Sequence, residues 1–118
     1  MKDKILIIED EKKMREVLQL YLEKKNYEVL LAEDGVKGLE MAKKNDVSCI
    51  VTDLKMPKMN GIDVLKHIKD FNNDIPVIII TAFGTIDTAI QSIKIGAYDY
   101  ITKPFDVKEL NKLIDNAV

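Results

Sequence analysis

Short apolar runs alternate along the chain with segments in which apolar residues recur every three or four positions. The apolar runs cover residues 4–8, 27–32, 49–52, 76–80 and 98–101. Most of them consist of Ile, Val and Leu, which is typical of strands buried on both faces. The intervening segments predict amphipathic helices over about residues 11–25, 36–42, 60–71, 85–95 and 106–114.

This alternation predicts an α/β fold, because short buried strands separated by amphipathic helices form a parallel sheet covered on both faces. Right-handed crossovers between parallel strands limit the possible topologies to a few. The chain has 118 residues, with no internal repeat and no linker-like stretch. We therefore expect a single domain spanning residues 1–118.

The helical spacing also predicts which side chains face the core and where the helices begin and end. Asn26 is suited to end the first helix, Thr85 or Asp87 to cap the fourth, and Asp106 to cap the last. The expected inward rows are Met14, Val17, Leu18, Tyr21 and Leu22 in the first helix, and Val64, Leu65, Ile68 and Phe71 in the third.

Composition and charge narrow the range of possible functions. Apolar residues make up 47% of the chain and charged residues 32%, and the formal net charge is −2. This balance gives no reason to expect a nucleic-acid or membrane surface in this segment, and no apolar run approaches the roughly 20 residues that span a bilayer. The lone Cys49 lies in an apolar run and reads as a small core residue. The expected compartment is the cytoplasm.

The candidate chemistry lies where the predicted strands end. Asp53 closes the third apolar run, and Pro57 prevents the strand from continuing. The carboxyl ends of parallel strands open on one edge, where such sheets place their ligands. That edge would gather Asp53 with Glu9 and Asp10 after the first strand. Thr81 and Lys103, at the ends of the fourth and fifth strands, would join them.

Each of these residues has a plainer interpretation when taken alone. Acidic residues such as Glu9 and Asp10 favour a helix N-terminus through the helix dipole, Lys103 could be a solvated surface lysine, and Thr81 a strand-end hydroxyl. Taken together, the carboxylates repel one another unless a cation lies among them, and an all-oxygen site suits Mg²⁺.

This combination is consistent with phosphoryl transfer. A transferring phosphoryl group spreads charge over its peripheral oxygens, so positioning and charge neutralisation provide most of the catalysis. Mg²⁺, the Lys103 ammonium and the Thr81 hydroxyl could each hold one oxygen. A carboxylate can act as nucleophile and form an acyl phosphate, and Asp53 is the best placed to do so.

These residues resemble the receiver domain of two-component response regulators. The resemblance spans the whole chain and rests on motifs that each follow a strand. They are Ile-Leu-Ile-Ile-Glu-Asp-Glu over 5–11, Asp-Leu-Lys-Met-Pro over 53–57, Asn60-Gly61, Thr81-Ala82 and Lys103-Pro104-Phe105. It implies a flavodoxin-like (βα)5 three-layer sandwich with a five-stranded parallel sheet of order 2-1-3-4-5.

The resemblance also assigns roles to residues. It implies that Asp53 is the phosphoacceptor, that Asp10 binds Mg²⁺ directly, and that the backbone carbonyl of Lys55 is a further ligand. Thr81 and Lys103 would contact the phosphoryl oxygens, and the Lys103–Pro104 bond would be cis. Many members have two aspartates where this chain has Glu9-Asp10, so we expect the longer Glu9 side chain to approach the metal through water.

A switch is implied in the same way. The family couples Thr81 to an aromatic residue on the fifth strand, which here is Tyr100. If Thr81 moves toward a phosphoryl group, Tyr100 can turn into the space it leaves; the plainer alternative is an aromatic ring with a solvated hydroxyl. Phosphorylation would then alter the surface formed by the helix over about 85–95, the fifth strand and the last helix.

The implied partners are a sensor histidine kinase and either the protein's own output domain or a separate partner protein. A homodimer through the switch surface is a further expectation. Such a chain catalyses its own phosphorylation and slow dephosphorylation and acts as a switch. Phe83, two residues after Thr81, is a candidate shield that slows hydrolysis of the acyl phosphate.

Several functions compete for this pattern. The stretches over 81–90 and 96–106 resemble receivers of nitrogen-regulation-type transcription activators, which favours a transcriptional output. A stand-alone receiver of a phosphorelay or chemotaxis-type pathway is the alternative. A phosphatase with an aspartate nucleophile is disfavoured, because Lys55 stands where the haloacid-dehalogenase type has a second acid. A flavin carrier is disfavoured by the acidic turn after the first strand.

Overall fold

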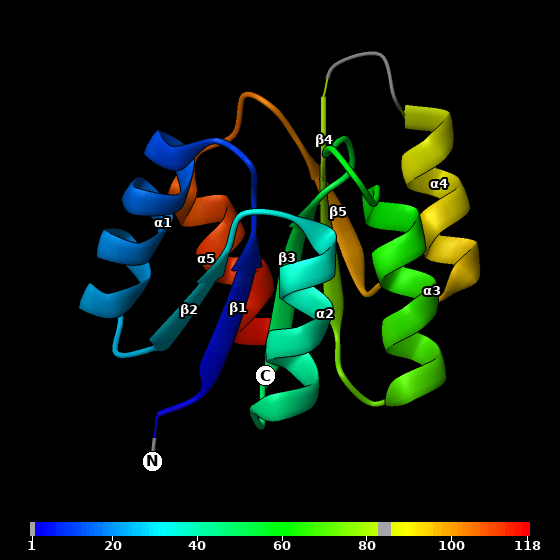
Figure 1. Cartoon of the computed structure of the whole chain (residues 1–118). Coiled ribbons are helices and arrows are strands. Elements are labelled where there is room, and N and C mark those ends of the chain that lie inside the picture. Colours follow the sequence, from blue (N-terminus) through cyan, green and yellow to red (C-terminus); the bar gives the residue numbers. More distant parts are fainter. Residues whose placement is uncertain (1, 83–85) are drawn as a thin grey trace.

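Strands and helices alternate along the chain in the computed structural model, which describes residues 2–82 and 86–118 (Figure 1). The strands are β1 (Lys4–Ile8), β2 (Glu28–Ala32), β3 (Cys49–Asp53), β4 (Val77–Thr81) and β5 (Asp99–Thr102). The helices are α1 (Lys12–Lys24), α2 (Gly35–Lys44), α3 (Gly61–Phe71), α4 (Ile86–Ile95) and α5 (Val107–Ala117). The predicted succession of elements is confirmed, with boundaries shifted by up to three residues.

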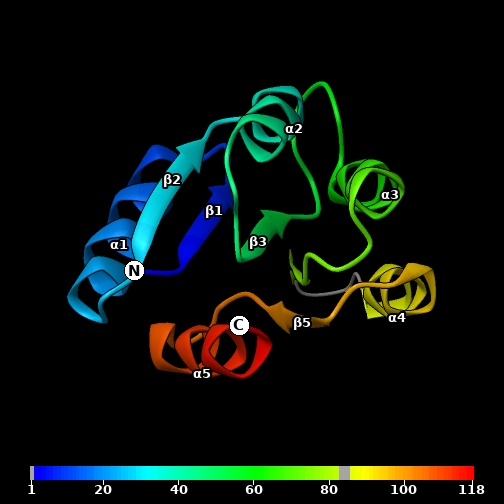
Figure 2. The ribbon, with the colours of Figure 1, turned by 90° about the horizontal axis from the view of Figure 1, so that it is seen from below.

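The strands form one parallel sheet in the order β2-β1-β3-β4-β5, which confirms the predicted topology. Helices α1 and α5 cover one face of this sheet, and α2, α3 and α4 cover the other (Figure 2). The molecule is therefore a three-layer α/β sandwich. Every residue of β3 and β4 is buried, because helices cover both faces of these central strands.

Alternation along the strands divides the core into two apolar clusters. Ile5 and Ile7 of β1 lie in the cluster under α1 and α5, whereas Leu6 and Ile8 lie in the cluster under α2 and α3. Successive side chains of a strand point to opposite faces, so one short strand serves both layers. The buried Cys49 belongs to the first of these clusters, as a core residue should.

Two residues predicted to face the core are instead exposed. The side chain of Val17 in α1 is 50% exposed, and that of Phe71 in α3 is 47% exposed. A helix lying on a sheet buries only a narrow stripe, and in α1 the fully buried positions are Leu18 and Leu22. Phe71 is the last residue of α3, where the inward row runs out.

Side chains at the helix ends fix where several helices begin. Asp34, Asn60 and Asp106 each accept a hydrogen bond from a backbone N–H of the first turn of α2, α3 and α5. Asn26 follows α1 with a φ of 72°, a conformation that ends a helix. Asp87 lies inside the first turn of α4, so it is not the cap. The alternative cap, Thr85, lies outside the described residues.

Within the described part of the chain, no helix has the length and apolar character needed to cross a membrane.

Candidate functional site

The parallel register aligns the carboxyl ends of the strands at one edge of the sheet. Ile8 of β1 lies beside Thr52 of β3, and Asp53 lies beside Ile80 of β4. Main-chain hydrogen bonds extend the ladder past the strands, from the Glu9 N–H to Ala32 (3.0 Å) and from the Lys103 N–H to Thr81 (2.8 Å). The residues that follow β1, β3, β4 and β5 are thereby brought to one place.

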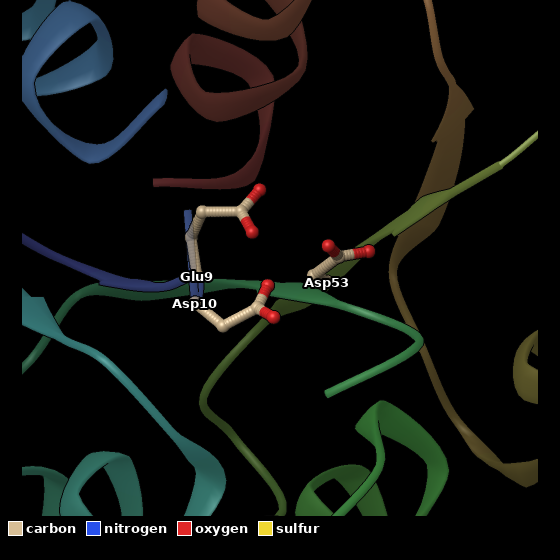
Figure 3. A group of neighbouring side chains, drawn as sticks. All are labelled: Glu9, Asp10 and Asp53. Carbon is tan, nitrogen blue, oxygen red and sulfur yellow. The ribbon is translucent and has the colours of Figure 1, made fainter. Parts of the chain in front are cut away.

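Three carboxylates converge at this edge. Oxygens of Glu9, Asp10 and Asp53 all lie within 4.8 Å of one another, and the side chains point toward a common space (Figure 3). Glu9 and Asp53 are buried, whereas Asp10 is exposed. The structure thus brings together the acidic residues that the sequence predicted to meet.

Lys103 provides the opposite charge. Its Nζ lies 3.0 Å from Oδ2 of Asp53 and 3.2 Å from Oε1 of Glu9. Burial disfavours the charged ammonium, but the hydrogen bond to Asp53 and the charges of both carboxylates outweigh it and raise the pKa of Lys103. The lysine is therefore a fixed cation next to Asp53. The Lys103–Pro104 peptide bond is cis, as predicted.

Glu9 is more buried and makes more polar contacts than its position in the sequence indicated. Its residue is fully buried, and its Oε2 accepts a hydrogen bond from the Glu11 N–H at 3.3 Å. Burial, followed by the charge of Asp53, raises the pKa of Glu9 to about 7. The expected contact of Glu9 with a metal through water stays a prediction, but its direct pairing with Lys103 was missed.

Thr81 and Tyr100 project from neighbouring strands on the same face of the sheet. Tyr100 of β5 pairs with Ile79 of β4, two residues before Thr81, so the two side chains are diagonal neighbours. Thr81 is buried and Tyr100 is half-buried against the core. Coupling between them stays a prediction.

Two further predictions concern residues that closely follow Asp53 and Thr81 in the sequence. Lys55 is exposed in the turn after β3, close in sequence to Asp53, and the role of its carbonyl as a ligand stays a prediction. Phe83, the candidate shield of the acyl phosphate, lies outside the described residues.

Gly61 supports the site in a way that the sequence did not reveal. A Cβ atom at this position would lie 2.6 Å from the carbonyl oxygen of Asp53 and 2.9 Å from the Cα of Leu54. The Gly61 N–H donates to the Leu54 carbonyl at 2.7 Å. The first residue of α3 therefore packs directly on the backbone of Asp53. The Asn60-Gly61 pair indicated a helix start, but not this close approach.

The donor set at this edge fits a small divalent cation. It offers carboxylate oxygens, with no His or Cys in the group, and Asp10 is open to solvent. Oxygen-only sites with a few carboxylates and room for water suit Mg²⁺. A cation here would offset the repulsion between the carboxylates. The fold and this site together define a three-layer α/β domain with an acidic, cation-binding type of pocket at the carboxyl ends of its strands.

Comparison with known proteins identifies the family. The chain belongs to the response regulator receiver domain family, whose profile matches residues 5–115. Receiver domains act as phosphoryl-accepting switches, generally bind Mg²⁺ at an acidic pocket, and interact with histidine kinases and output domains. The resemblance noted from the strand-end motifs is thereby confirmed.

Related proteins are regulators of transcription. The chain is 39% identical over 109 residues to the uncharacterized transcriptional regulatory protein YkoG of Bacillus subtilis, covering 92% of this chain and 48% of the relative. It is 38% identical over 114 residues to the transcriptional regulatory protein ZraR of Klebsiella oxytoca, covering 97% and 26%. The chain thus spans about half or less of the length of these relatives.

Solved structures share the fold. A response regulator receiver domain protein from Clostridium thermocellum superposes with a TM-score of 0.94 at 38% identity, over 98% of this chain and 93% of that one. NtrX from Brucella abortus, solved in complex with ADP, superposes with a TM-score of 0.93 at 28% identity, over 99% and 27%. These neighbours confirm the receiver fold.

Proposed function

We propose that Asp53 accepts a phosphoryl group from a sensor histidine kinase. The observation that carries this proposal is the position of the Lys103 Nζ, 3.0 Å from Asp53 Oδ2, beside a cluster of three carboxylates. A carboxylate oxygen of Asp53 attacks phosphorus, the bond from phosphorus to the histidine nitrogen breaks, and the leaving imidazole takes up a proton. Lys103 neutralises charge on the peripheral oxygens.

The same proposal includes a bound Mg²⁺ ion. Asp10, Asp53 and the carbonyl of Lys55 would hold it directly, and Glu9 would contribute through water or by orienting Lys103. Bound there, the ion supplies charge neutralisation for the phosphoryl oxygens. The Thr81 hydroxyl, at the end of β4, would donate a hydrogen bond to one of these oxygens.

We further propose that phosphorylation changes the surface of α4, β5 and α5 through Thr81 and Tyr100. The diagonal placement of these two residues supports this coupling. The affected surface would contact an output domain that regulates transcription, or a second copy of the chain. A stand-alone receiver acting on a separate protein is the alternative, and both versions take residues 1–118 as one receiver domain. The transcriptional regulators among the relatives support the first version, under which the switch would act in the cytoplasm with the DNA.

Phosphorylation by a small acyl phosphate tests the proposal. We expect the wild type to gain the mass of one phosphoryl group in the presence of Mg²⁺, and Asp53→Asn to gain none. Asp46→Asn removes an exposed carboxylate near the amino ends of the strands and should react like the wild type. A mass gain that persists in Asp53→Asn would place the acceptor on another residue.

A further inference from the structure

Arg15 connects helix α1 to the end of strand β1. It lies one turn into α1 and is half-buried, and its Nη1 donates a hydrogen bond to the backbone carbonyl oxygen of Glu9 at 2.7 Å. A charged donor at this distance makes a strong hydrogen bond, worth more than a neutral one. The side chain thus holds the main chain at the first residue of the acidic turn.

That turn carries two of the three clustered carboxylates. Glu9, Asp10 and Glu11 connect β1 to α1. The direction of the Glu9 and Asp10 side chains therefore depends on the backbone path of this short segment. The Glu9 N–H is bound to Ala32 on the neighbouring strand. The Glu9 carbonyl oxygen accepts the hydrogen bond from Arg15, so both main-chain polar groups of Glu9 are held in place.

The start of α1 has little other support. Among the described helix starts, Asp34, Asn60 and Asp106 cap their helices with a side-chain oxygen, whereas Glu11 makes no such bond at the start of α1. The Glu11 N–H instead donates to Glu9 Oε2 at 3.3 Å. The geometry of the turn therefore rests on contacts made to Glu9, and Arg15 provides the one that comes from the helix.

We infer that Arg15 is a positioning residue for the metal-binding acidic turn, and that it strengthens Mg²⁺ binding although it is itself a cation. This inference rests on the proposed function, because it concerns the Mg²⁺ site proposed there. The Arg15 guanidinium donates its hydrogen bond to the backbone carbonyl of Glu9. The hydrogen bond and charge of Lys37 lower the pKa of Glu33, and the Arg15 charge adds to this shift. The effect of Arg15 on the Glu9 and Asp10 carboxylates passes through the turn. Supporting partners of metal ligands typically contribute about 10- to 100-fold to metal affinity.

The sign of the effect separates positioning from simple electrostatics. A positive charge beside a cation site repels the cation, so removing the charge alone would tighten Mg²⁺ binding. Loosening the turn would instead let the Asp10 and Glu9 carboxylates move away from Asp53 and weaken binding. These two mechanisms predict opposite changes in the same dissociation constant.

Calorimetric titration with Mg²⁺ at constant ionic strength tests the inference. We expect Arg15→Ala to raise the Mg²⁺ dissociation constant about tenfold, and Arg15→Lys, which keeps the charge and one donor, to restore part of the affinity. Lys12→Ala is the matched control: it removes the same charge from the same helix, and the Lys12 side chain is 80% exposed in a loose pair with Glu16. Its dissociation constant should stay within about twofold of the wild type.

Unchanged or tighter binding in Arg15→Ala would overturn the inference, as would an equal weakening in Lys12→Ala. If circular dichroism shows that Arg15→Ala does not fold, Arg15→Met decides in its place with the same expected weakening, because it keeps the apolar stem but lacks both the charge and the donor to Glu9. Failure of the wild type to bind Mg²⁺ would instead refute the proposed metal site itself, so the two failures are distinguishable.

Discussion

The Lys103 ammonium is shared between two buried carboxylates that come from different strands. It lies 3.0 Å from Asp53 and 3.2 Å from Glu9, and its side chain is 27% exposed. Paired charges of this kind offset the cost of burying each one. The lysine therefore holds the acidic cluster together, and under the proposed function it would face the phosphoryl oxygens after transfer.

Replacing Lys103 tests this double role. We expect Lys103→Gln to slow phosphorylation by acyl phosphate on the order of 100-fold, because a preorganised charge next to the reacting oxygens is lost. Mass spectrometry over time measures the rate. Lys108→Gln, on the exposed side of α5, should keep the wild-type rate. Equal rates in all three proteins would exclude Lys103 from the transfer step.

Cys49 offers a test of burial at one residue. Burial raises the pKa of the Cys49 thiol to about 12, and the side chain is fully enclosed in β3. Because the thiolate is the reactive form, iodoacetamide at pH 8.5 should leave the folded protein unlabelled and label it fully in urea. Rapid labelling of the native protein would contradict the buried position.

At the scale of residues, the sequence predicted which residues gather at the site better than it predicted how their side chains pair. Asp53, Asp10 and Lys103 were identified because strand ends meet at one edge. The pairing of Glu9 with Lys103 was missed, because the two residues are 94 positions apart and the pairing depends on side-chain directions that no local pattern encodes. Arg15 was missed for a similar reason, since its partner is a backbone carbonyl.

At the scale of elements, the junction between β3 and α3 controls where Asp53 sits. We expect Gly61→Ala to cost about 1–3 kcal/mol of unfolding free energy, because its Cβ would collide with the backbone of Asp53 and Leu54. Phosphorylation should slow as well, since the backbone of Asp53, the proposed acceptor, must shift. Urea unfolding and the phosphorylation time course measure the two effects.

Gly38→Ala is the comparison for this junction. A Cβ at Gly38 would meet only side-chain atoms of Ile8 among its nearest neighbours, so it should lower stability without moving Asp53. We expect its folded fraction to phosphorylate at the wild-type rate. If Gly61→Ala also kept that rate, contact between α3 and the acceptor backbone would not position Asp53.

The elements themselves were well predicted because each carries its own signal. Runs of Ile with Leu or Val marked β1 and β4, and a 3.6-residue period marked the helices. The inward faces were predicted less well: Val17 and Phe71 are apolar and suitably spaced, yet exposed. Spacing defines a stripe, but the width of the sheet beneath decides which of its members are covered.

At the scale of the whole molecule, a contact at the opposite edge ties the last helix to the sheet. The Tyr27 hydroxyl donates to the carboxylate of Asp115, which lies 88 residues away in α5 and also accepts a hydrogen bond from Asn111. Tyr27 precedes β2 and is buried. The bond therefore connects the edge strand of the sheet to the end of the chain's last helix.

Removing this hydroxyl should destabilise the protein. We expect Tyr27→Phe to lower the free energy of unfolding by about 1 kcal/mol, because Asp115 loses a buried donor. Urea denaturation measures the change. Tyr98→Phe makes the same chemical change on a ring that is 45% exposed and should be neutral. An equally small effect in both variants would mean that the bond adds no stability.

The same residue gives a pH dependence. Burial, with the hydrogen bond and charge of Asp115, raises the pKa of Tyr27 above its ordinary value of 10.0. Above that value the unfolded chain releases the phenolic proton first, so the wild type should lose stability as pH rises past 10. The Tyr27→Phe variant should lose less over the same range.

The overall topology was predictable and this distant contact was not. Alternating strands and helices predicted a parallel sheet, and the motifs shared with receivers gave its order. Tyr27 and Asp115 carried no signal, because a tyrosine before a strand and an aspartate on a polar helix face are ordinary in any domain. Only the packed sheet places them together.

Strand order also has a consequence for synthesis. Glu9, Asp10 and Asp53 come before Lys103 in the chain and are translated earlier, because Lys103 follows the edge strand β5, the last strand to be made. For the interval between, the growing chain carries the three carboxylates of this cluster without the lysine that pairs with Glu9 and Asp53. Synthesis of the segment that contains β5 and Lys103 thus adds the counter-charge together with the last strand of the sheet.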